Sequence, residues 1–301
     1  MKWKLCLAGI LLGATASLGA GGVRLRYKLS DGQVLRYHET IDGAGEFVPP
    51  DGGEPVRLRL EGSVQREWRV QRAKRRPRFG IDSQVAEAKL RGMRGTEVEE
   101  AAYPAARLWL EMTETGKIGQ VRPHPPDSPP PEPLNLLGLP LDLNALFHGL
   151  LTVELPEEPV EKGATWLEEE MPLPLGNGSE EKARIHIRLQ DLQPYRGQDC
   201  AEIDAGFEAP LEVLTQWEGT PVVVKGRVRE AMLLHFALER GLVIHAEGTL
   251  ELEWTLTEAD AGGPSPPPAA SVKMTLKLET NLEESPWRGR KSNEENKGSK
   301  P

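Results

Sequence analysis

The sequence predicts a mainly β protein, an antiparallel curved sheet or half-barrel built from two similar β units with one short connecting helix. Apolar and polar residues alternate in many short segments, which is typical of strands with one buried and one solvent-facing side. The segments follow one another without helical patterns between them, which favours antiparallel pairing because parallel strands need crossover connections. The two halves of the chain also resemble each other, and a proline-rich segment separates them.

The first twenty residues are typical of a secretory signal peptide. Lys2 and Lys4 precede an apolar run over Leu5–Leu12, and small residues follow up to Ala20. The apolar run is too short to span a bilayer, and no later apolar segment is long enough to do so. The sequence therefore predicts a signal peptide over residues 1–20 and an extracytoplasmic protein of a bacterium, periplasmic or secreted, without a transmembrane segment after cleavage.

Charge and cysteine content exclude some classes of function. The chain of 301 residues has a formal net charge of -9, which makes nucleic-acid binding a poor hypothesis because phosphate contacts need a basic surface. Cys6 lies in the signal peptide, so Cys200 is the single cysteine of the mature chain and no intramolecular disulfide is possible. We expect Cys200 to be a small buried residue rather than a reactive thiol.

The first β unit is expected over residues 23–122 and the second over 156–284. Strict alternation marks strands at Val56–Leu60, Arg184–Leu189, Thr249–Thr257 and Val272–Leu278. In the third of these, four apolar residues alternate with acidic and hydroxyl residues, which predicts one buried face: Leu250, Leu252, Trp254 and Leu256.

An internal repeat supports the duplication. Gly32 begins a segment that continues into a long strand, and Gly163 begins a similar segment in the second half. Hairpin turns at Gly116 and Gly241 follow at nearly the same offset, each with a glutamate two residues before the glycine. Two matches at nearly equal offset indicate a duplicated β unit.

Residues 123–155 form the predicted connection. Pro123–Pro133 is proline-rich and is expected to be extended. A short helix is then predicted, capped by Asp142 and ending near Gly149. Its apolar face is formed by Leu143, Leu146, Phe147 and Leu150. The tail over residues 285–301 is polar and aperiodic and is expected to be disordered.

The run from Leu155 to Trp166 resembles a motif of uncharacterised secreted bacterial proteins with a duplicated β domain. It reads Pro-x-x-Pro-Val-x-x-Gly-x-x-Trp from Pro156, and in that group it opens the second half. The resemblance implies no known activity. More loosely, the layout is similar to that of periplasmic lipoprotein carriers, whose curved sheet holds acyl chains under a helical lid, an analogy of fold alone. Trp166 also fits a purely structural role as a core anchor at the start of a strand.

No catalytic or metal-binding motif is found, and no cofactor is expected. His186 is expected on a solvent-facing side of its strand. A three-residue loop at Glu239–Gly241 would set His235 opposite His245, whereas a two-residue loop would put them on opposite faces. Even in the first case, two ligands are too few for zinc. The acidic clusters are expected to be solvated: Glu97, Glu99 and Glu100; Glu157 and Glu158; and Glu168, Glu169 and Glu170.

Two segments are candidate binding sites. The residues Arg72, Lys74, Arg75, Arg76 and Arg78 are expected at a hairpin tip, either simply exposed or in contact with anionic lipid or cell-wall polymer. The leucine-rich stretch Leu134–Leu151 is either an ordinary core segment or a lid over a concave sheet. As a lid it would bind an apolar ligand through Leu143, Leu146, Phe147, Leu150 and Trp166.

These observations favour an exported, soluble, non-enzymatic envelope protein that binds an apolar or lipid ligand in the concave face of a β sheet. The alternative is a protein-interaction or structural scaffold that binds an envelope protein partner. A hydrolase is the third hypothesis.

Overall fold

The computed structural model describes residues 22–72, 78–103, 107–127, 134–136, 139–141, 152–172, 182–217, 220–258 and 270–283. Within these residues the chain is all β, which confirms the predicted fold class of an antiparallel, curved and open sheet. The predicted helix over residues 142–150, the signal peptide and the polar tail lie outside the described residues.

The main sheet has twelve strands in the order β6-β5-β3-β2-β1-β14-β13-β12-β11-β10-β9, and β4 pairs with β3 beside this path. A small second sheet pairs β7 with β8. The strands of the first half are β1 (Val34–Val48), β2 (Val56–Arg72), β3 (Arg78–Arg94), β4 (Glu97–Tyr103), β5 (Arg107–Thr113), β6 (Ile118–Pro123), β7 (Leu134–Leu136) and β8 (Leu139–Leu141). Those of the second half are β9 (Thr165–Pro172), β10 (Lys182–Tyr195), β11 (Gln198–Trp217), β12 (Thr220–Ala237), β13 (Leu242–Glu258) and β14 (Ala270–Glu283).

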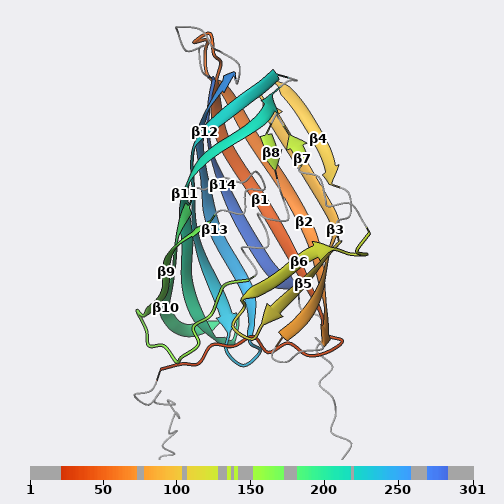
Figure 1. Cartoon of the computed structure of the whole chain (residues 1–301), viewed down its shortest axis with the longest axis vertical. Coiled ribbons are helices and arrows are strands. Elements are labelled where there is room, and N and C mark those ends of the chain that lie inside the picture. The colour runs from red at the N-terminus through yellow and green to blue at the C-terminus, as the bar shows by residue number, and fades with distance from the viewer. Residues whose placement is uncertain are drawn as a thin grey trace, which may run out of the picture.

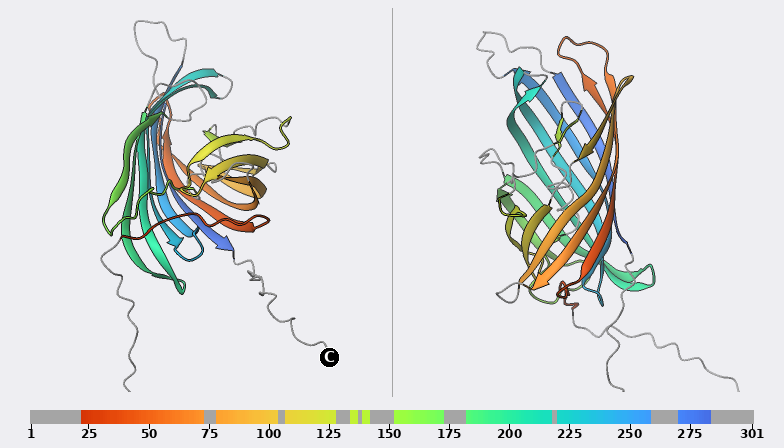
Figure 2. Two further views of the ribbon diagram at one scale, coloured as in Figure 1. Left: turned by 60° about the horizontal axis from the view of Figure 1, so that its bottom comes forward. Right: turned by 90° about the vertical axis from the view of Figure 1, so that its right-hand side faces the viewer.

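Both halves belong to one continuous sheet. The first strand, β1, pairs with the last strand, β14, along their lengths, from Arg36 opposite Glu283 to Val48 opposite Ser271. The sheet therefore curves from β9 and β10 on one side to β5 and β6 on the other and encloses a concave side (Figures 1 and 2). The sequence left open whether the two units form one sheet or two, and the β1–β14 pairing answers that question.

The two glycines of the predicted repeat occupy equivalent places. Gly32 precedes β1 with φ of 76°, and Gly163 precedes β9 with φ of 85°. Both adopt the left-handed conformation that suits a tight turn and favours glycine. The shared role agrees with a duplicated unit, which stays a prediction from the sequence.

Alternation along the strands gives the sheet an apolar concave face and a charged convex face. On β14 every second residue is buried, and the residues between them are mainly exposed. The buried set includes Val272, Met274, Leu276 and Leu278. On the convex side, opposite charges pair across strands, such as Arg227 with Glu253 at 2.7 Å and Arg59 with Asp42 at 2.7 Å. Exposed pairs of this kind keep the face soluble but add little stability.

A strap over residues 22–31 crosses one end of the concave side (Figure 1, dark red). Its buried Tyr27 packs edge-on against Phe236 of β12, with ring centroids 5.3 Å apart. The backbone N–H of Tyr27 donates to the carbonyl of Glu114, and that of Lys28 donates to the carbonyl of Gly241. The strap therefore contacts hairpin turns of both halves and closes this end of the core.

Candidate functional site: the concave face

The register aligns a row of side chains across the concave face. Ile185 of β10 lies opposite Phe207 of β11, Phe207 lies opposite Glu230 of β12, and Glu230 lies opposite Leu250 of β13. The row continues to Leu276 of β14. Since directly opposed residues share a face of the sheet, Glu230 is a carboxyl group within an apolar row.

Glu230 is 9% exposed and has no hydrogen-bond or ion-pair partner among the described residues. Burial alone raises the pKa of its carboxyl to about 7, and no neighbouring charge contributes to the shift. Arg229, next to it in sequence, is exposed on the convex face, as alternation requires. Glu230 is therefore a largely buried carboxyl without a polar partner among the described residues, and its oxygens keep some contact with solvent.

Four apolar side chains on the β9 to β12 side of the concave face are only partly buried. They come from four adjacent strands and pack against the core from its open side: Leu167, Ile185, Phe207 and Val228. We call these four residues together with Glu230 the Glu230 patch. On β13, β14, β1 and β2 the large apolar side chains of the concave face are buried. The patch is thus a place where the apolar face remains accessible.

A second polar group on the concave face is fully paired. The Arg66 guanidinium donates to the Glu39 carboxylate, with Nε 3.1 Å from Oε1, and neither side chain is exposed. Burial raises the pKa of Glu39 to about 7, and the attraction of Arg66 opposes this shift. Because the two charges satisfy each other, the pair serves the core rather than a ligand.

Trp254 lies on the same face as Glu230, nearer the end of β12 that begins at Thr220. It lies opposite Gly226 of β12, where an added Cβ would come within 2.7 Å of the Trp254 Cβ. The indole Nε1 is buried and has no hydrogen-bond partner among the residues that the structure describes. Tryptophan packed against a cross-strand glycine stabilises such a position in a curved sheet.

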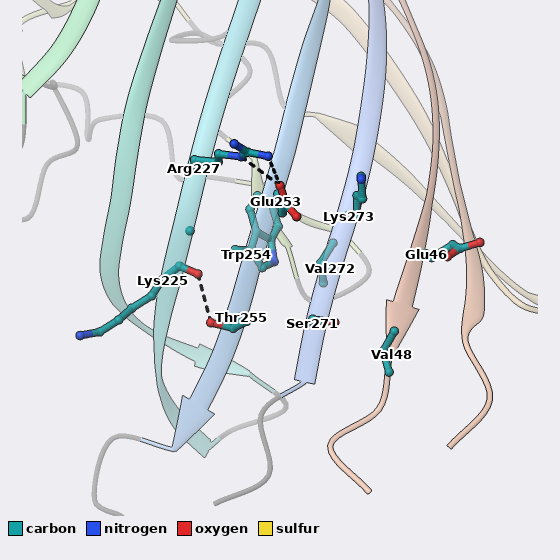
Figure 3. A pocket seen from close by; sticks show the side chains of 11 residues that line it. Glu46, Val48, Lys225, Arg227, Glu253, Trp254, Thr255, Ser271, Val272 and Lys273 are labelled. Atoms are coloured by element: carbon teal, nitrogen blue, oxygen red, sulfur yellow. Dashed lines mark hydrogen bonds and ion pairs between the residues drawn. The ribbon is translucent and has the colours of Figure 1, made fainter. Parts of the chain in front are cut away.

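A depression of about 490 Å³ lies over β12, β13, β14 and β1 (Figure 3). Its lining includes Arg227, paired with Glu253, and Lys225, which pairs with Glu212. The charged lining residues Arg227, Glu253 and Lys273 lie on the convex side of the sheet. The depression is therefore not part of the apolar concave face.

The hairpin between β12 and β13 brings His235 and His245 together on the convex face. They lie directly opposite each other, as expected for a three-residue loop, but the loop and the strand register differ from that expectation. Ala237 pairs with Leu242, and a register shift between His235 and Phe236 restores the alignment. Tyr195 stacks close to both rings, with centroids 3.7 Å from His235 and 5.2 Å from His245.

Each histidine of the pair has a polar neighbour on an adjacent strand. His245 Nδ1 lies 3.0 Å from the Asn281 Oδ1, and His235 Nδ1 lies 3.9 Å from the Glu202 carboxylate. Burial lowers the pKa of His235, and the neighbouring His245 lowers it further. Within the described residues no group of three or more histidine, cysteine or acidic side chains is placed to hold a metal ion.

Several predicted site residues fall outside the described part of the chain. These are the lid residues Leu143, Leu146, Phe147 and Leu150, and the cations Lys74, Arg75 and Arg76. Arg72 ends β2 and Arg78 begins β3, and the two strands pair, so the cationic segment does connect a hairpin. Arg78 lies 3.4 Å from Glu111. The lid and the anionic-surface contact both stay predictions.

The remaining predicted residues have local roles. Trp166, at the start of β9, is half-buried, and its Nε1 donates to the Glu154 carbonyl at 2.7 Å. His186 is exposed, as expected. Cys200 is buried with a free thiol, and burial raises its pKa. Of the acidic clusters, the described side chains are exposed: Glu97, Glu99, Glu100, Glu157 and Glu158.

Glu230 was missed in the sequence although a signal for it exists. The alternation of β12 puts Val222, Val224 and Val228 on one face, followed by Met232 and Leu234, and Glu230 falls within that set. A carboxyl at a position where the alternation of a strand predicts an apolar residue is the signal for such a buried group. Glu39 shows the same pattern between Tyr37 and Ile41.

No family model matches this chain, and no curated protein does. Two solved structures are similar in part. One is a lipovitellin, studied for its lipid–protein interactions, with 14% identity over 85% of this chain and a TM-score of 0.39. This chain spans 26% of that lipovitellin. The other is DynF from the dynemicin biosynthesis pathway of Micromonospora chersina, with 9% identity, coverage of 87% of this chain and 85% of DynF, and a TM-score of 0.26. Both scores are low, so neither likeness supports an inference about function.

In the part of the chain that the structure describes, no helix has the length and apolar character needed to cross a bilayer.

Proposed function

We propose that this chain is an exported, non-enzymatic protein that binds a lipid-like apolar ligand on the concave face of its sheet, at the Glu230 patch. The observation that carries the proposal is the patch itself. Four partly buried apolar side chains, one from each of the strands β9 to β12, extend from the sheet edge to one carboxyl that has no partner among the described residues. A site with an apolar lining and a few placed polar groups is typical of small-molecule binding.

The contrast between the two faces supports this location. The convex face carries cross-strand ion pairs, and contact with an apolar ligand would strip these charges of water. The concave face carries apolar side chains in every row, and burying more of their area against a ligand is favourable by about 25 cal/mol per Å². An apolar ligand therefore gains more on the concave side.

A titration with N-phenyl-1-naphthylamine, a neutral apolar fluorophore, tests the proposal. We expect saturable binding to the wild-type protein and at least tenfold weaker binding to Phe207→Gln, which makes the centre of the patch polar. Glu208→Gln is the matched control, because Glu208 is the next residue of β11 and is exposed. Equal binding to all three proteins, or none to the wild type, would contradict the proposal.

A further inference from the structure

We infer that the Glu230 carboxylate binds the head group of the ligand, and that this head group is a protonated primary amine on a single alkyl chain. The inference rests on the proposed function and adds the chemical class of the ligand. It is based on the position of Glu230, a largely buried carboxyl whose neighbouring side chains have no hydrogen-bond donor.

The neighbours of Glu230 on the concave face are all apolar. On the β11 side the register sets Phe207 opposite Glu230, with Ala205 and Ala209 flanking it on the same face. On the β13 side it sets Leu250 opposite, flanked by Gly248 and Leu252. None of these side chains can donate a hydrogen bond. A donor for this carboxyl therefore has to come from outside the described protein residues.

Charged residues near Glu230 in sequence do not reach it. Arg229 precedes it on β12 and pairs in register with Glu251 of β13, and both are exposed on the convex face. The sheet itself separates these charges from the concave side. A ligand that carries a donor to Glu230 would thus compete with solvent for this carboxyl and not with another side chain of the described residues.

The chemistry of the carboxyl selects among head groups. A hydrogen bond between an ammonium and a carboxylate is roughly twice as strong as one between neutral groups, so an amine gains more than an alcohol. A carboxylate head group would meet a like charge or require a proton between the two groups. The order of affinity expected is amine, then alcohol, then fatty acid.

The dimensions of the patch suit one alkyl chain. Its residues span four adjacent strands, β9 to β12, and three strand spacings of about 4.8 Å give about 14 Å. A single chain of about twelve carbons covers that width when it lies across the strands. Phe207 and Ile185 lie in the row of Glu230 and provide the first part of an apolar path. On the edge strand β9 the residue in register with Ile185 is Glu169, and Leu167 lies in the next row, opposite Ile187, so an apolar path to the edge runs diagonally to Leu167.

The test compares dodecylamine, dodecanol and dodecanoate by competition with N-phenyl-1-naphthylamine, below their micelle concentrations, at pH 7 and physiological salt. The wild type is compared with Glu230→Gln, which keeps the shape of the side chain and removes its charge. Glu251→Gln is the matched control, because it removes an exposed carboxylate from the convex face of the neighbouring strand. Circular dichroism shows whether each variant keeps its sheet.

We expect the wild type and Glu251→Gln to bind dodecylamine at least tenfold more tightly than dodecanol, and Glu230→Gln to bind the two equally. Equal binding of all three probes to the wild type would overturn the inference and leave the proposed function standing. An amine preference that persists in Glu230→Gln would also overturn it, since the acidic surface would then be the source. Failure of all three probes to bind the wild type would overturn the proposed function itself.

Discussion

Arg66 of β2 and Glu39 of β1 form an ion pair on the concave face with both side chains completely buried. The pair sits among apolar residues, so each charge depends on the other for its solvation. Of two buried carboxyls on this face, Glu39 is completely buried and Glu230 is 9% exposed, and only Glu39 has a partner among the described residues. That difference separates a structural group from a candidate ligand-binding group.

Replacing Arg66 by methionine should lower the free energy of unfolding by about 3–5 kcal/mol at pH 8, because it leaves a buried carboxylate without its partner. The loss should be smaller at pH 5, because burial raises the pKa of Glu39 to about 7 even beside Arg66, and removing Arg66 raises it further, so the carboxyl of the variant is neutral at that pH. Urea unfolding at both pH values measures it. The double variant Glu39→Leu/Arg66→Met is the control and should be more stable than Arg66→Met at pH 8. A loss that is the same at both pH values would contradict this account of the pair.

Glu230→Gln should stabilise the protein at pH 8. The folded-state pKa of about 7 lies above the ordinary value of 4.5, so the folded protein binds the proton more tightly than the unfolded chain does. The stability that this group contributes is present below pH 4.5 and is lost as pH rises to about 7. The full loss is about 3 kcal/mol, and glutamine avoids it. Glu251→Gln should show no such gain, and a gain for Glu230→Gln that is equal at pH 4 and pH 8 would refute the assignment.

His235 should contribute a pH dependence of opposite sign. Burial lowers its pKa in the folded state, so the unfolded chain binds the proton more tightly and stability falls as pH drops below about 6.5. His235→Phe keeps a ring against Tyr195 and removes the titration. Between pH 7.5 and 5.5 the variant should lose less stability than the wild type in thermal unfolding. Identical slopes for His235→Phe and the wild type would count against this role.

Two turn glycines separate the effect of the strap from that of backbone conformation. Both glycines have positive φ, 61° for Gly241 and 75° for Gly197. A Cβ added at Gly241 would come 2.6 Å from the carbonyl oxygen of Arg26 in the strap. A Cβ added at Gly197 would meet no atom within 4 Å. Gly197→Ala should cost about 1–2 kcal/mol for its backbone conformation alone. Gly241→Ala should cost clearly more, because it also displaces the strap. Chemical denaturation compares the two, and equal costs would mean that the strap does not hold this turn.

The alternation of residues was enough to predict the fold class and much of the face assignment. The four residues expected to face inward on β13, Leu250, Leu252, Trp254 and Leu256, are all buried. The joining of the two halves could not be predicted, because β1 and β14 are far apart in the chain and no turn fixes their register. His235 and His245 show a related limit. Their alignment depends on a register shift that neither loop length considered from the sequence contains.

The candidate site was only partly accessible to sequence reasoning. A concave apolar binding face was expected, but the residues named for it were those of the 142–150 segment and Trp166 rather than the patch on β9 to β12. Glu230 was overlooked because the acidic residues were judged by clustering in sequence. The surroundings of an isolated carboxyl depend on the neighbouring strands, whose register the sequence does not give. In the structure Phe207 and Leu250 lie opposite Glu230, and neither can donate a hydrogen bond to it.

Native mass spectrometry of the protein purified after export, compared with its denatured mass, tests the central claim most directly. We predict that the wild type carries extra mass that partitions into organic solvent, and that Phe207→Gln purified in the same way carries none or much less. A wild-type native mass equal to that of the bare chain, together with no gain of mass on incubation with dodecylamine or dodecanol, would contradict the claim that the concave face binds an apolar ligand.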